Sequence, residues 1–500
     1  MGDTASPMLS ARVQWGLIVL VMLSYVAAFL WWYPPTIINM DESAYVRQAY
    51  LLLDGRSTAD VLNLFTGETT SIRPSNFPPG TAALLALFVA VGGWKVAFLA
   101  SFCALLATVL ITARWLVADG RSPLFALLIA GFPPALAFGR MTTSDVPSAA
   151  VVAVGLYLFW KGLDGRRIPW LLSGFIAGAS MLFRETNVVL FAPLFAGALL
   201  RRDPGWPALL IGGAAGVTLR AIVSYAAFGS VFFLKDPAYG FSLANVSRNL
   251  GVDALGLLVL IPAGLLVAVS YRGRRRPEVI VAIGLFVGVY LSFGYTAEES
   301  GYLQRLLLRL RFYIPLLPLL AFIAAEVLPR WWTAALLHRS RAVAARSARI
   351  GRWVVIFWAV GIAAIAIGVN ISLYRYGIGQ SRVRDLIYSH TPDRAIIVTN
   401  LRMTQRYIQD YFGPRQVVDR EGRQSRDVHV LADRHGEVYV VLFDRNTSDY
   451  LKQHSLENAE FVERIEHPME VVLDEPTSDT ERIRIWRIRS DPGDRAFSER

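Results

Sequence analysis

Two adjacent carboxylates follow the first long apolar run of the chain. Asp41 and Glu42 lie where this run ends, and acidic side chains beside a membrane span are costly unless they are solvated or used. A carboxylate here can act as a general base, drawing a proton from an acceptor hydroxyl while that hydroxyl attacks an anomeric carbon. A structural interpretation stays open beside this one, in which Asp41 is the N-cap of a helix over 42–54.

A second acidic position, Asp145, lies between two later apolar runs, at the same predicted level as Asp41. Ser144 or Asp145 can also serve as a helix N-cap, because Pro147 follows and proline is favoured in a first helical turn. For Asp145 taken alone, the cap is the simpler explanation. The pair favours a function, since two acidic sites converge on one face of an otherwise apolar bundle.

Arginines accompany these acids. Arg184 stands at the end of one apolar run, Arg305, Arg309 and Arg311 precede another, and Arg220 lies inside a third. A membrane arginine that faces the bundle marks a functional site by default, and a guanidinium suits bidentate binding of phosphate. The alternatives are a snorkelling side chain or a structural ion pair, for example between Arg184 and the glutamate that follows it.

Some chemistries are not expected. All six histidines lie at or after His338, so no histidine-based metal site is expected beside Asp41 and Asp145. A divalent cation held by oxygen ligands from Asp41, Glu42 and Asp145 stays open. No glycine-rich nucleotide loop or Walker motif occurs, so a nucleotide-sugar donor in a cytosolic Rossmann domain is not expected.

The composition places these residues in a polytopic membrane protein. The chain has 500 residues, 54% of them hydrophobic, and a mean hydropathy of +0.41. The apolar runs stop near residue 375, and since a span needs roughly 20 apolar residues we expect about eleven transmembrane helices. The expected spans are 15–33, 94–117, 122–140, 146–162, 168–183, 186–200, 206–228, 252–271, 277–295, 312–329 and 353–374. A shorter apolar helix over 79–92 is expected in the outer interface.

Charge orients these spans. The net charge is +11, and its arginines cluster between apolar runs, as in cytoplasmic loops that face anionic lipid. Nucleic acid is therefore not the expected partner. With an internal N-terminus, the basic loops fall on the cytoplasmic side and the acidic loop 34–93 falls outside. We expect an integral protein of the plasma (inner) membrane with an extracytoplasmic active site.

The chain is expected to divide into a transmembrane domain, 1–374, and an extracytoplasmic α/β domain, 375–500. Ala395–Val398 and Val438–Leu442 have the pattern of short buried strands, and Ile483–Ile488 alternates as a half-exposed strand does. Thr404–Tyr411 has a helical period. This domain shows no catalytic motif.

At this point the chain resembles the dolichyl-phosphate-mannose protein mannosyltransferase superfamily, in the bacterial branch that includes the lipid A aminoarabinose transferase. The resemblance covers roughly residues 15–330, and it depends on the order and common side of several motifs that are each weak alone. The motifs are Asp41-Glu42-Ser43-Ala44-Tyr45, Asn76-Phe77-Pro78-Pro79-Gly80, Thr143-Ser144-Asp145, Arg184-Glu185-Thr186 and Arg311-Phe312-Tyr313-Ile314-Pro315-Leu316-Leu317-Pro318.

The resemblance implies a GT-C fold, a polyprenyl-phosphate-sugar donor and inversion at the anomeric carbon. It implies that Asp41 is the base and that Glu42 and Asp145 shape the acceptor and sugar site. It further implies that Arg184 and Arg311 hold the donor phosphate.

Other positions depend on the same resemblance. Tyr45 and Asn76 are the expected substrate-loop residues. Many members have lysine just before the Pro-Pro pair, where this chain has Phe77, so Arg73 or another cation is expected to serve the phosphate. Arg220, as an arginine inside a span, is also expected to bind the donor phosphate.

The expected function is transfer of a sugar from a polyprenyl-phosphate carrier to a glycan, lipid or protein of the cell envelope. The alternative is a transporter or flippase for lipid-linked sugars, which would also have many spans and buried charge. No clear repeat relates the two halves, and the acids lie in outer loops and not on broken helices at mid-membrane. The enzyme is therefore the favoured interpretation.

Overall fold

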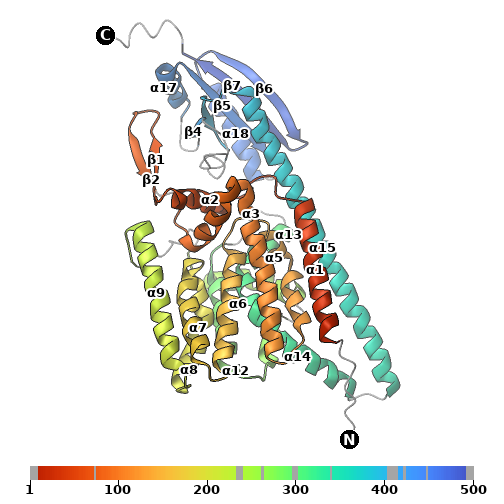
Figure 1. Cartoon of the computed structure of the whole chain (residues 1–500). Helices are drawn as coiled ribbons and strands as arrows, with labels where there is room; N and C mark the ends of the chain where they lie inside the picture. Colours follow the sequence, from red (N-terminus) through yellow and green to blue (C-terminus); the bar gives the residue numbers. More distant parts are fainter. Residues whose placement is uncertain are drawn as a thin grey trace. The chain divides into compact units, whose positions relative to one another are not determined.

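The computed structural model describes residues 10–72, 75–231, 240–260, 264–295, 302–337, 341–401, 415–420, 424–445 and 449–490. The chain forms two compact units, each built from separate stretches of sequence (Figure 1). The helical unit comprises Met1–Tyr33, Pro78–Leu84 and Phe98–Ser372. The mixed unit comprises Pro34–Phe77, Leu85–Ala97 and Leu373–Arg500.

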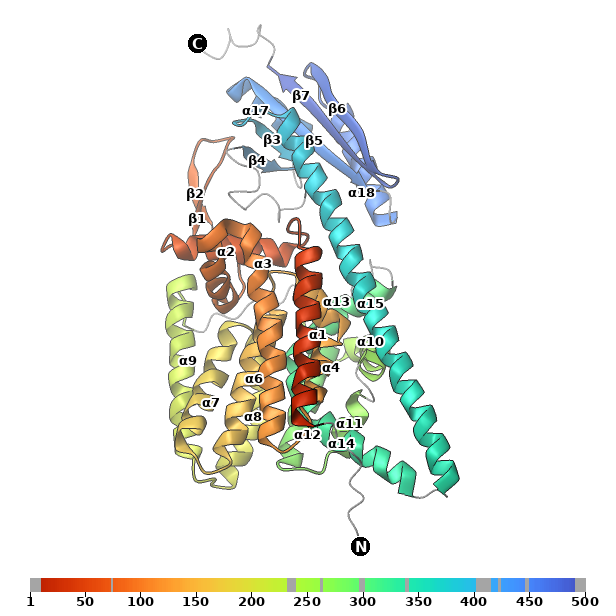
Figure 2. The same ribbon diagram turned by 45° about the vertical axis from the view of Figure 1, so that its right-hand side comes forward.

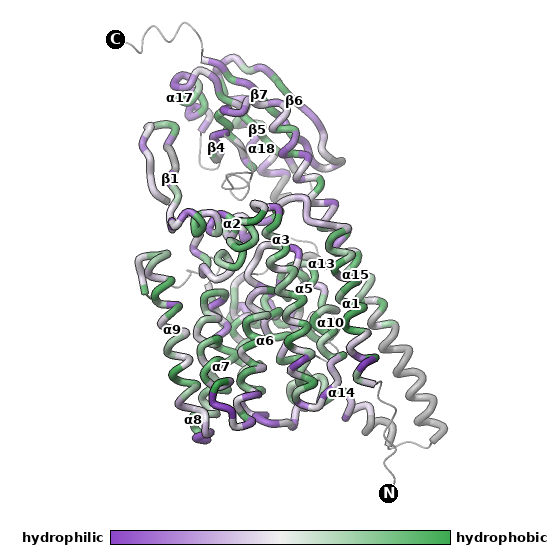
Figure 3. Tube along the Cα trace, in the orientation of Figure 1, coloured by the Kyte–Doolittle hydropathy of each residue, from purple (hydrophilic) through white to green (hydrophobic). Residues whose placement is uncertain are grey.

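The helical unit is a bundle of apolar helices, whose hydrophobic residues run along most of their length (Figure 3). Long stretches without charge form helices here because every backbone polar group is then bonded within the segment, as a bilayer requires. In chain order the helices are α1 (Ala11–Trp31), α3 (Pro79–Ala118), α6 (Asp145–Gly162), α7 (Arg167–Ala179), α8 (Val188–Leu200), α9 (Trp206–Phe228), α10 (Ala244–Leu260), α11 (Gly264–Ser270), α12 (Arg276–Ser292), α13 (Tyr302–Leu310), α14 (Leu317–Leu337) and α15 (Arg341–His390). Two of them also contribute to the mixed unit, α3 through Leu85–Ala97 and α15 through the residues from Leu373 on.

Five helices in the described part of the chain are long and apolar enough to cross a membrane: Ala11–Trp31, Pro79–Ala118, Trp206–Phe228, Arg305–Trp332 and Val360–His390. Most other expected spans correspond to shorter helices. The expected span 122–140 is wrong as a single helix. It is broken into η1 (Pro123–Ala126), α4 (Leu127–Ala130) and α5 (Pro133–Phe138). The break follows from Pro133 and Pro134, since proline disfavours a helical residue before it.

Helices α7 and α9 pack with their backbones in close contact. A Cβ added at Gly212 would lie 1.9 Å from the carbonyl oxygen of Leu171, and one at Gly174 would lie 2.0 Å from that of Leu209. Small residues permit this close approach. In a bilayer no hydrophobic force drives helices together, so dispersion contacts between closely packed helices stabilise the pair. These glycines therefore set the position of α7, whose far end leads to Arg184.

The basic loops are joined to one another by ion pairs. Arg201 lies 2.8 Å from Glu278, which is also 3.5 Å from Arg275. A second group joins Arg121 and Arg330 to Glu326, at 2.8 and 2.6 Å. Loops and helix ends that lie far apart in the sequence therefore meet in the first group, and in the second the loop residue Arg121 meets two residues of α14.

Helix α3 bends within its length. Gly92 and Gly93 have non-helical backbone angles, and Gly93 has a φ of 65°, which favours glycine. The expected break between 79–92 and 94–117 is thus confirmed, although the two segments form one bent helix.

The mixed unit contains a helix, a hairpin and a five-stranded sheet. Helix α2 (Met40–Leu53) precedes the antiparallel hairpin β1 (Ala59–Leu62) and β2 (Thr69–Ile72). The sheet has the order β4-β3-β5-β7-β6, with β4, β3 and β5 parallel and β5, β7 and β6 antiparallel. Its strands are β3 (Ile396–Thr399), β4 (Gln416–Asp419), β5 (Glu437–Arg445), β6 (Met469–Ser478) and β7 (Glu481–Arg489), and its helices are α17 (Ser425–His435) and α18 (Asp449–Glu463).

The three expected strands are confirmed as β3, β5 and β7, while the expected helix Thr404–Tyr411 lies outside the described residues. Helix α15 leads into this sheet as one helix of 50 residues (Figure 2).

The hairpin turn belongs to the core of the sheet. Leu64 is 6% exposed and packs in one cluster with apolar side chains of α17, β5, α18 and β7. Arg434 donates to the carbonyl oxygens of Phe65 and Thr66, and His435 Nε2 lies 3.0 Å from that of Leu64. The loop that carries Asp41 is thereby fastened to the C-terminal part of the chain.

Candidate active site

Helix α2 begins with a capping box just before Asp41. Asn39 Oδ1 accepts the backbone N–H groups of Asp41 and Glu42, at 2.8 and 3.3 Å, and Glu42 Oε2 accepts those of Ile38 and Asn39, at 3.0 and 3.1 Å. The expected cap at Asp41 is therefore wrong, because Asn39 occupies that position. The cap uses the buried carboxylate of Glu42 and leaves that of Asp41, which is partly exposed, outside this motif.

Tyr45, one turn beyond Asp41, is buried in packing. Its ring stacks on Phe77 with centroids 4.6 Å apart, and Gln48 donates to the Phe77 carbonyl at 3.4 Å. Phe77 thus holds the exit of the loop against α2. Asn76 is exposed, and Arg73 lies outside the described residues.

In the helical unit, Asp145 and Arg184 form an ion pair. Arg184 Nη2 lies 2.9 Å from Asp145 Oδ1, and the two side chains are 14% and 2% exposed. The turn that carries Arg184 is held by Asn187, which donates to the Ser180 carbonyl at 3.0 Å and accepts from Ser148 at 2.8 Å. A buried pair of this kind is maintained by fixed geometry, because either charge alone would be costly there.

Aromatic rings connect this pair to Arg311. The guanidinium carbons of Arg184 and Arg311 lie 5.3 and 5.0 Å from the centre of the Phe312 ring. Arg311 also lies 5.1 Å from the ring of Phe138. Two cations thus share one ring, with the carboxylate of Asp145 beside Arg184, and these four side chains taken together carry a net positive charge. Such a cluster suits an anion that binds between its guanidinium groups.

Tyr290 belongs to this cluster, and sequence reasoning missed it. Its hydroxyl lies 2.7 Å from Thr186 Oγ1 and 3.4 Å from Arg184 Nη1, and its ring stacks on Phe312 with centroids 5.1 Å apart. Tyr290 stands inside an apolar run without any charged neighbour, so no spacing signal distinguishes it from an ordinary core residue.

Asp253 was also missed. It pairs with Arg309 in the interior of the helical unit, with each side chain 1% exposed and Arg309 Nη2 2.7 Å from Asp253 Oδ2. A usable signal existed, because an aspartate inside an expected span requires a partner. Arg309 precedes the expected span 312–329, and no sequence spacing connects it to Asp253.

Arg220 has a different set of described contacts. It is 5% exposed and donates to the carbonyl oxygen of Val231 at 3.1 Å. Together with Glu185, Pro78 and Pro79 it lines a small cavity. These contacts place Arg220 at the cavity, and its expected role toward the donor phosphate stays a prediction.

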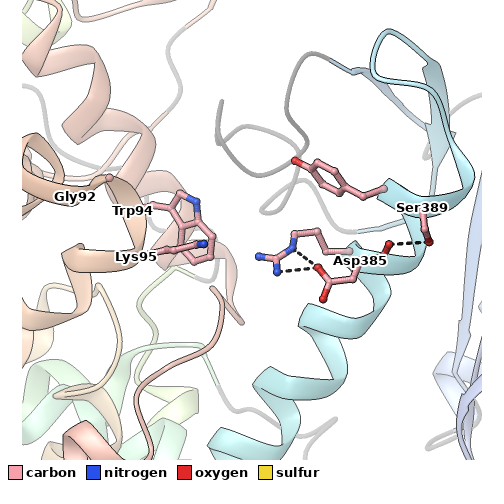
Figure 4. A pocket seen from close by; sticks show the side chains of 8 residues that line it. Gly92, Trp94, Lys95, Asp385 and Ser389 are labelled. Atoms are coloured by element: carbon pink, nitrogen blue, oxygen red, sulfur yellow. Dashed lines mark hydrogen bonds and ion pairs between the residues drawn. The ribbon is translucent and has the colours of Figure 1, made fainter.

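The mixed unit has a larger groove of about 700 Å³ (Figure 4). One wall is Gly92–Lys95, at the bend of α3, and the other is the end of α15, with Arg384, Asp385 and Tyr388. Arg384 Nη2 lies 2.9 Å from Asp385 Oδ1, and Lys95 is exposed. With two cations and one carboxylate, the groove can accept a polar ligand that carries negative charge.

The candidate metal ligands do not form a cluster in the described structure. Among the residues that it covers, no group of three or more histidine, cysteine, aspartate or glutamate side chains could hold a metal ion. Asp41 and Glu42 belong to the mixed unit, and Asp145 belongs to the helical unit.

Comparisons with known proteins agree with this architecture. Residues 76–219 match the family described as dolichyl-phosphate-mannose-protein mannosyltransferase. No curated protein matches the sequence at a significant level.

Two solved structures of ArnT from Cupriavidus metallidurans have a similar fold. The apo structure superposes with a TM-score of 0.60 at 14% identity, covering 96% of this chain and 98% of that one. The structure bound to undecaprenyl phosphate gives a TM-score of 0.59 at 13% identity, covering 94% and 98%. The similarity extends over nearly the full length of both proteins, so the two share one fold.

Proposed function

We propose that this chain is a GT-C glycosyltransferase that transfers a sugar from a polyprenyl-phosphate carrier to an acceptor of the cell envelope. The observation that carries the proposal is the cluster of Arg184 and Arg311 around Phe312, with Asp145 beside it. The similar fold of ArnT, which was solved with undecaprenyl phosphate bound, supports a lipid phosphate as the donor.

In the proposed reaction an acceptor hydroxyl attacks the anomeric carbon of the donor sugar. The bond from this carbon to the phosphate oxygen breaks, and the lipid phosphate leaves with the bonding electrons. Asp41 takes the proton of the attacking hydroxyl, and attack from the opposite side inverts the anomeric carbon. Arg184 and Arg311 stabilise the charge on the departing phosphate, so that catalysis is mainly positioning and electrostatics.

The structure suggests different tasks for the three acids. Glu42 is engaged in the capping box and fixes the start of α2, so its proposed role is to hold Asp41 in place. Asp145 neutralises Arg184, and we assign it to the orientation of that guanidinium and of the sugar. Asp41 is the proposed base, as the family resemblance implies.

The proposed location is the plasma membrane, with the active site on the outer face. Arg201, Arg275 and their carboxylate partner Glu278 lie at one group of connected loops, and Arg121 lies at another. Basic loops face the cytoplasm in most membrane proteins, which supports this orientation. Cysteine scanning of these loops with an impermeant reagent in intact cells would test it, and labelling from outside would contradict it.

The groove of the mixed unit is the proposed contact for an anionic part of the acceptor. On this proposal Lys95→Ala raises the KM for the acceptor about threefold to tenfold and leaves the KM for the donor unchanged. Lys452→Ala, in α18 of the same unit, is the matched control. If the acceptor KM is the same in the wild type and in both variants, the groove does not bind the acceptor.

The deciding experiment measures transfer of radiolabelled sugar from a panel of polyprenyl-phosphate sugars to envelope glycans and lipids. Asp41→Asn is expected to lower the rate about 10²- to 10⁴-fold, as loss of a general base does, while retaining donor binding. Asp60→Asn changes an exposed acid of the same loop and should keep full activity. Carrier activity that survives Asp41→Asn, with no transfer by the wild type, would support a transporter instead.

A further inference from the structure

Asp253 and Arg309 form several hydrogen bonds with each other and with their neighbours. Arg309 Nε and Nη2 donate to the two carboxylate oxygens of Asp253, at 3.0 and 2.7 Å, and Tyr313 donates to Asp253 Oδ2 at 2.7 Å. Both side chains are almost fully buried. A bidentate pair with satisfied oxygens holds its members in one geometry, because every alternative leaves a buried charge without a partner.

The same arginine extends to the backbone of α12. Its Nη2 donates to the carbonyl oxygen of Tyr290 at 2.6 Å, and its Nη1 donates to that of Tyr295 at 2.5 Å. The Tyr290 carbonyl lies in the last turn of α12, where it also accepts the backbone N–H of Phe293 at 3.3 Å, and Tyr295 lies beyond the end of the helix. Arg309 therefore fixes the backbone from which the side chain of Tyr290 projects.

The side chain of Tyr290 is in turn bonded to the turn that carries Arg184. Its hydroxyl contacts both Thr186 and Arg184, and the guanidinium carbon of Arg184 lies 6.0 Å from its ring centre. A continuous chain of contacts therefore leads from Asp253 through Arg309 and Tyr290 to Arg184.

We propose that Tyr290 is a positioning residue for the phosphate-binding Arg184, and that the buried pair of Asp253 and Arg309 fixes Tyr290 from behind. This inference rests on the proposed function for the identity of the anion. Long side chains lose rotamer freedom when they bind, and an arginine that is already held loses less. The network thus improves donor binding without touching the donor.

The first test is Tyr290→Phe, which removes one hydroxyl and keeps the ring that stacks on Phe312. A neutral hydrogen bond is modest in strength, so we expect the donor KM to rise about threefold to tenfold while the acceptor KM stays unchanged. Tyr271→Phe removes another buried hydroxyl, bonded to the Arg274 carbonyl, and should leave both values unchanged. An unchanged donor KM in Tyr290→Phe would overturn the proposal.

Arg309→Lys provides a second, conservative test. Lysine keeps the positive charge beside Asp253 but cannot form the fork or bind both carbonyl groups at once. We expect a selective rise in donor KM here too. A folded Arg309→Lys protein with the donor KM of the wild type would refute the role of the pair.

A third measurement does not depend on turnover. The thermal unfolding midpoints of Tyr290→Phe, Arg184→Gln and the double variant form a cycle, followed by tryptophan fluorescence. If the hydroxyl holds Arg184, the double variant shifts by less than the sum of the single shifts. Strictly additive shifts would overturn the proposal. If the wild type transfers no sugar, the proposed function fails, and this cycle still decides the contact.

Discussion

The loop that carries Asp41 is fastened to the C-terminal part of the chain through Leu64, and Leu64→Ala tests what this contact does. The side chain is 6% exposed among apolar residues of the sheet core. Leucine-to-alanine changes in cores cost about 2–5 kcal/mol. Because a hairpin tip can relax more than a core strand, we expect the lower end, about 2 kcal/mol, for the docking of the hairpin. That corresponds to about a 30-fold larger undocked population.

Hydrogen exchange measures this population directly. The backbone amides of β1 and β2 should exchange about 30-fold faster in Leu64→Ala than in the wild type, if exchange proceeds through undocking. Leu456→Ala is the matched control, because Leu456 is 67% exposed on α18. The rate of sugar transfer should fall when the hairpin is undocked, because the hairpin and α2 belong to the same loop. Unchanged exchange in the hairpin would refute the reasoning, and faster exchange with full activity would separate the hairpin from catalysis.

Other predictions follow from packing and from charge. Gly212→Ala should destabilise the helical unit by about 1–3 kcal/mol in thermal unfolding, because its Cβ would overlap the Leu171 carbonyl. Gly284→Ala meets open space in α12 and should be neutral or stabilising, and equal effects of both changes would contradict the close packing. In the mixed unit, burial lowers the pKa of His429, whose Nε2 accepts the backbone N–H of Glu466 at 3.0 Å. The fold thus favours the neutral ring. The contribution of His429 to the free energy of unfolding is therefore complete above the ordinary histidine pKa of about 6.5, and it is lost as pH falls through the lowered pKa of the folded state. The unfolding midpoint should fall on acidification, and it should fall less in His429→Gln; parallel curves would exclude this origin.

Much of the fold follows from local sequence patterns. Helix α9 has the bounds that its apolar run predicts, Trp206–Phe228, and the strand at Ile483–Ile488 was readable from alternation alone. These patterns succeed because helix and strand periods depend on neighbouring residues. The span at 122–140 failed because hydropathy ignores the backbone restrictions of Pro133 and Pro134.

The candidate site was harder to predict, since its contacts join distant segments. Arg184 was identified by its position at the end of an apolar run, but its partner Asp145 could not be chosen over the neighbouring Glu185 without the fold. Tyr290 contributes through one hydroxyl that lies 106 residues from Arg184 in sequence. No local period reports such a contact, because it is made by the packing of α12 against the turn before α8.

The buried pair of Asp253 and Arg309 also has a consequence for biosynthesis. Its partners are 56 residues apart, and at about 5–20 residues per second the ribosome needs about 3–11 seconds to make the intervening chain. During that interval α10 holds an aspartate whose arginine does not yet exist, and a lone carboxylate in a bilayer is costly. α10 is therefore expected to wait beside the translocation channel until α13 arrives. The helices α10 and α13 are then expected to insert into the membrane together, once both Asp253 and Arg309 have been synthesised.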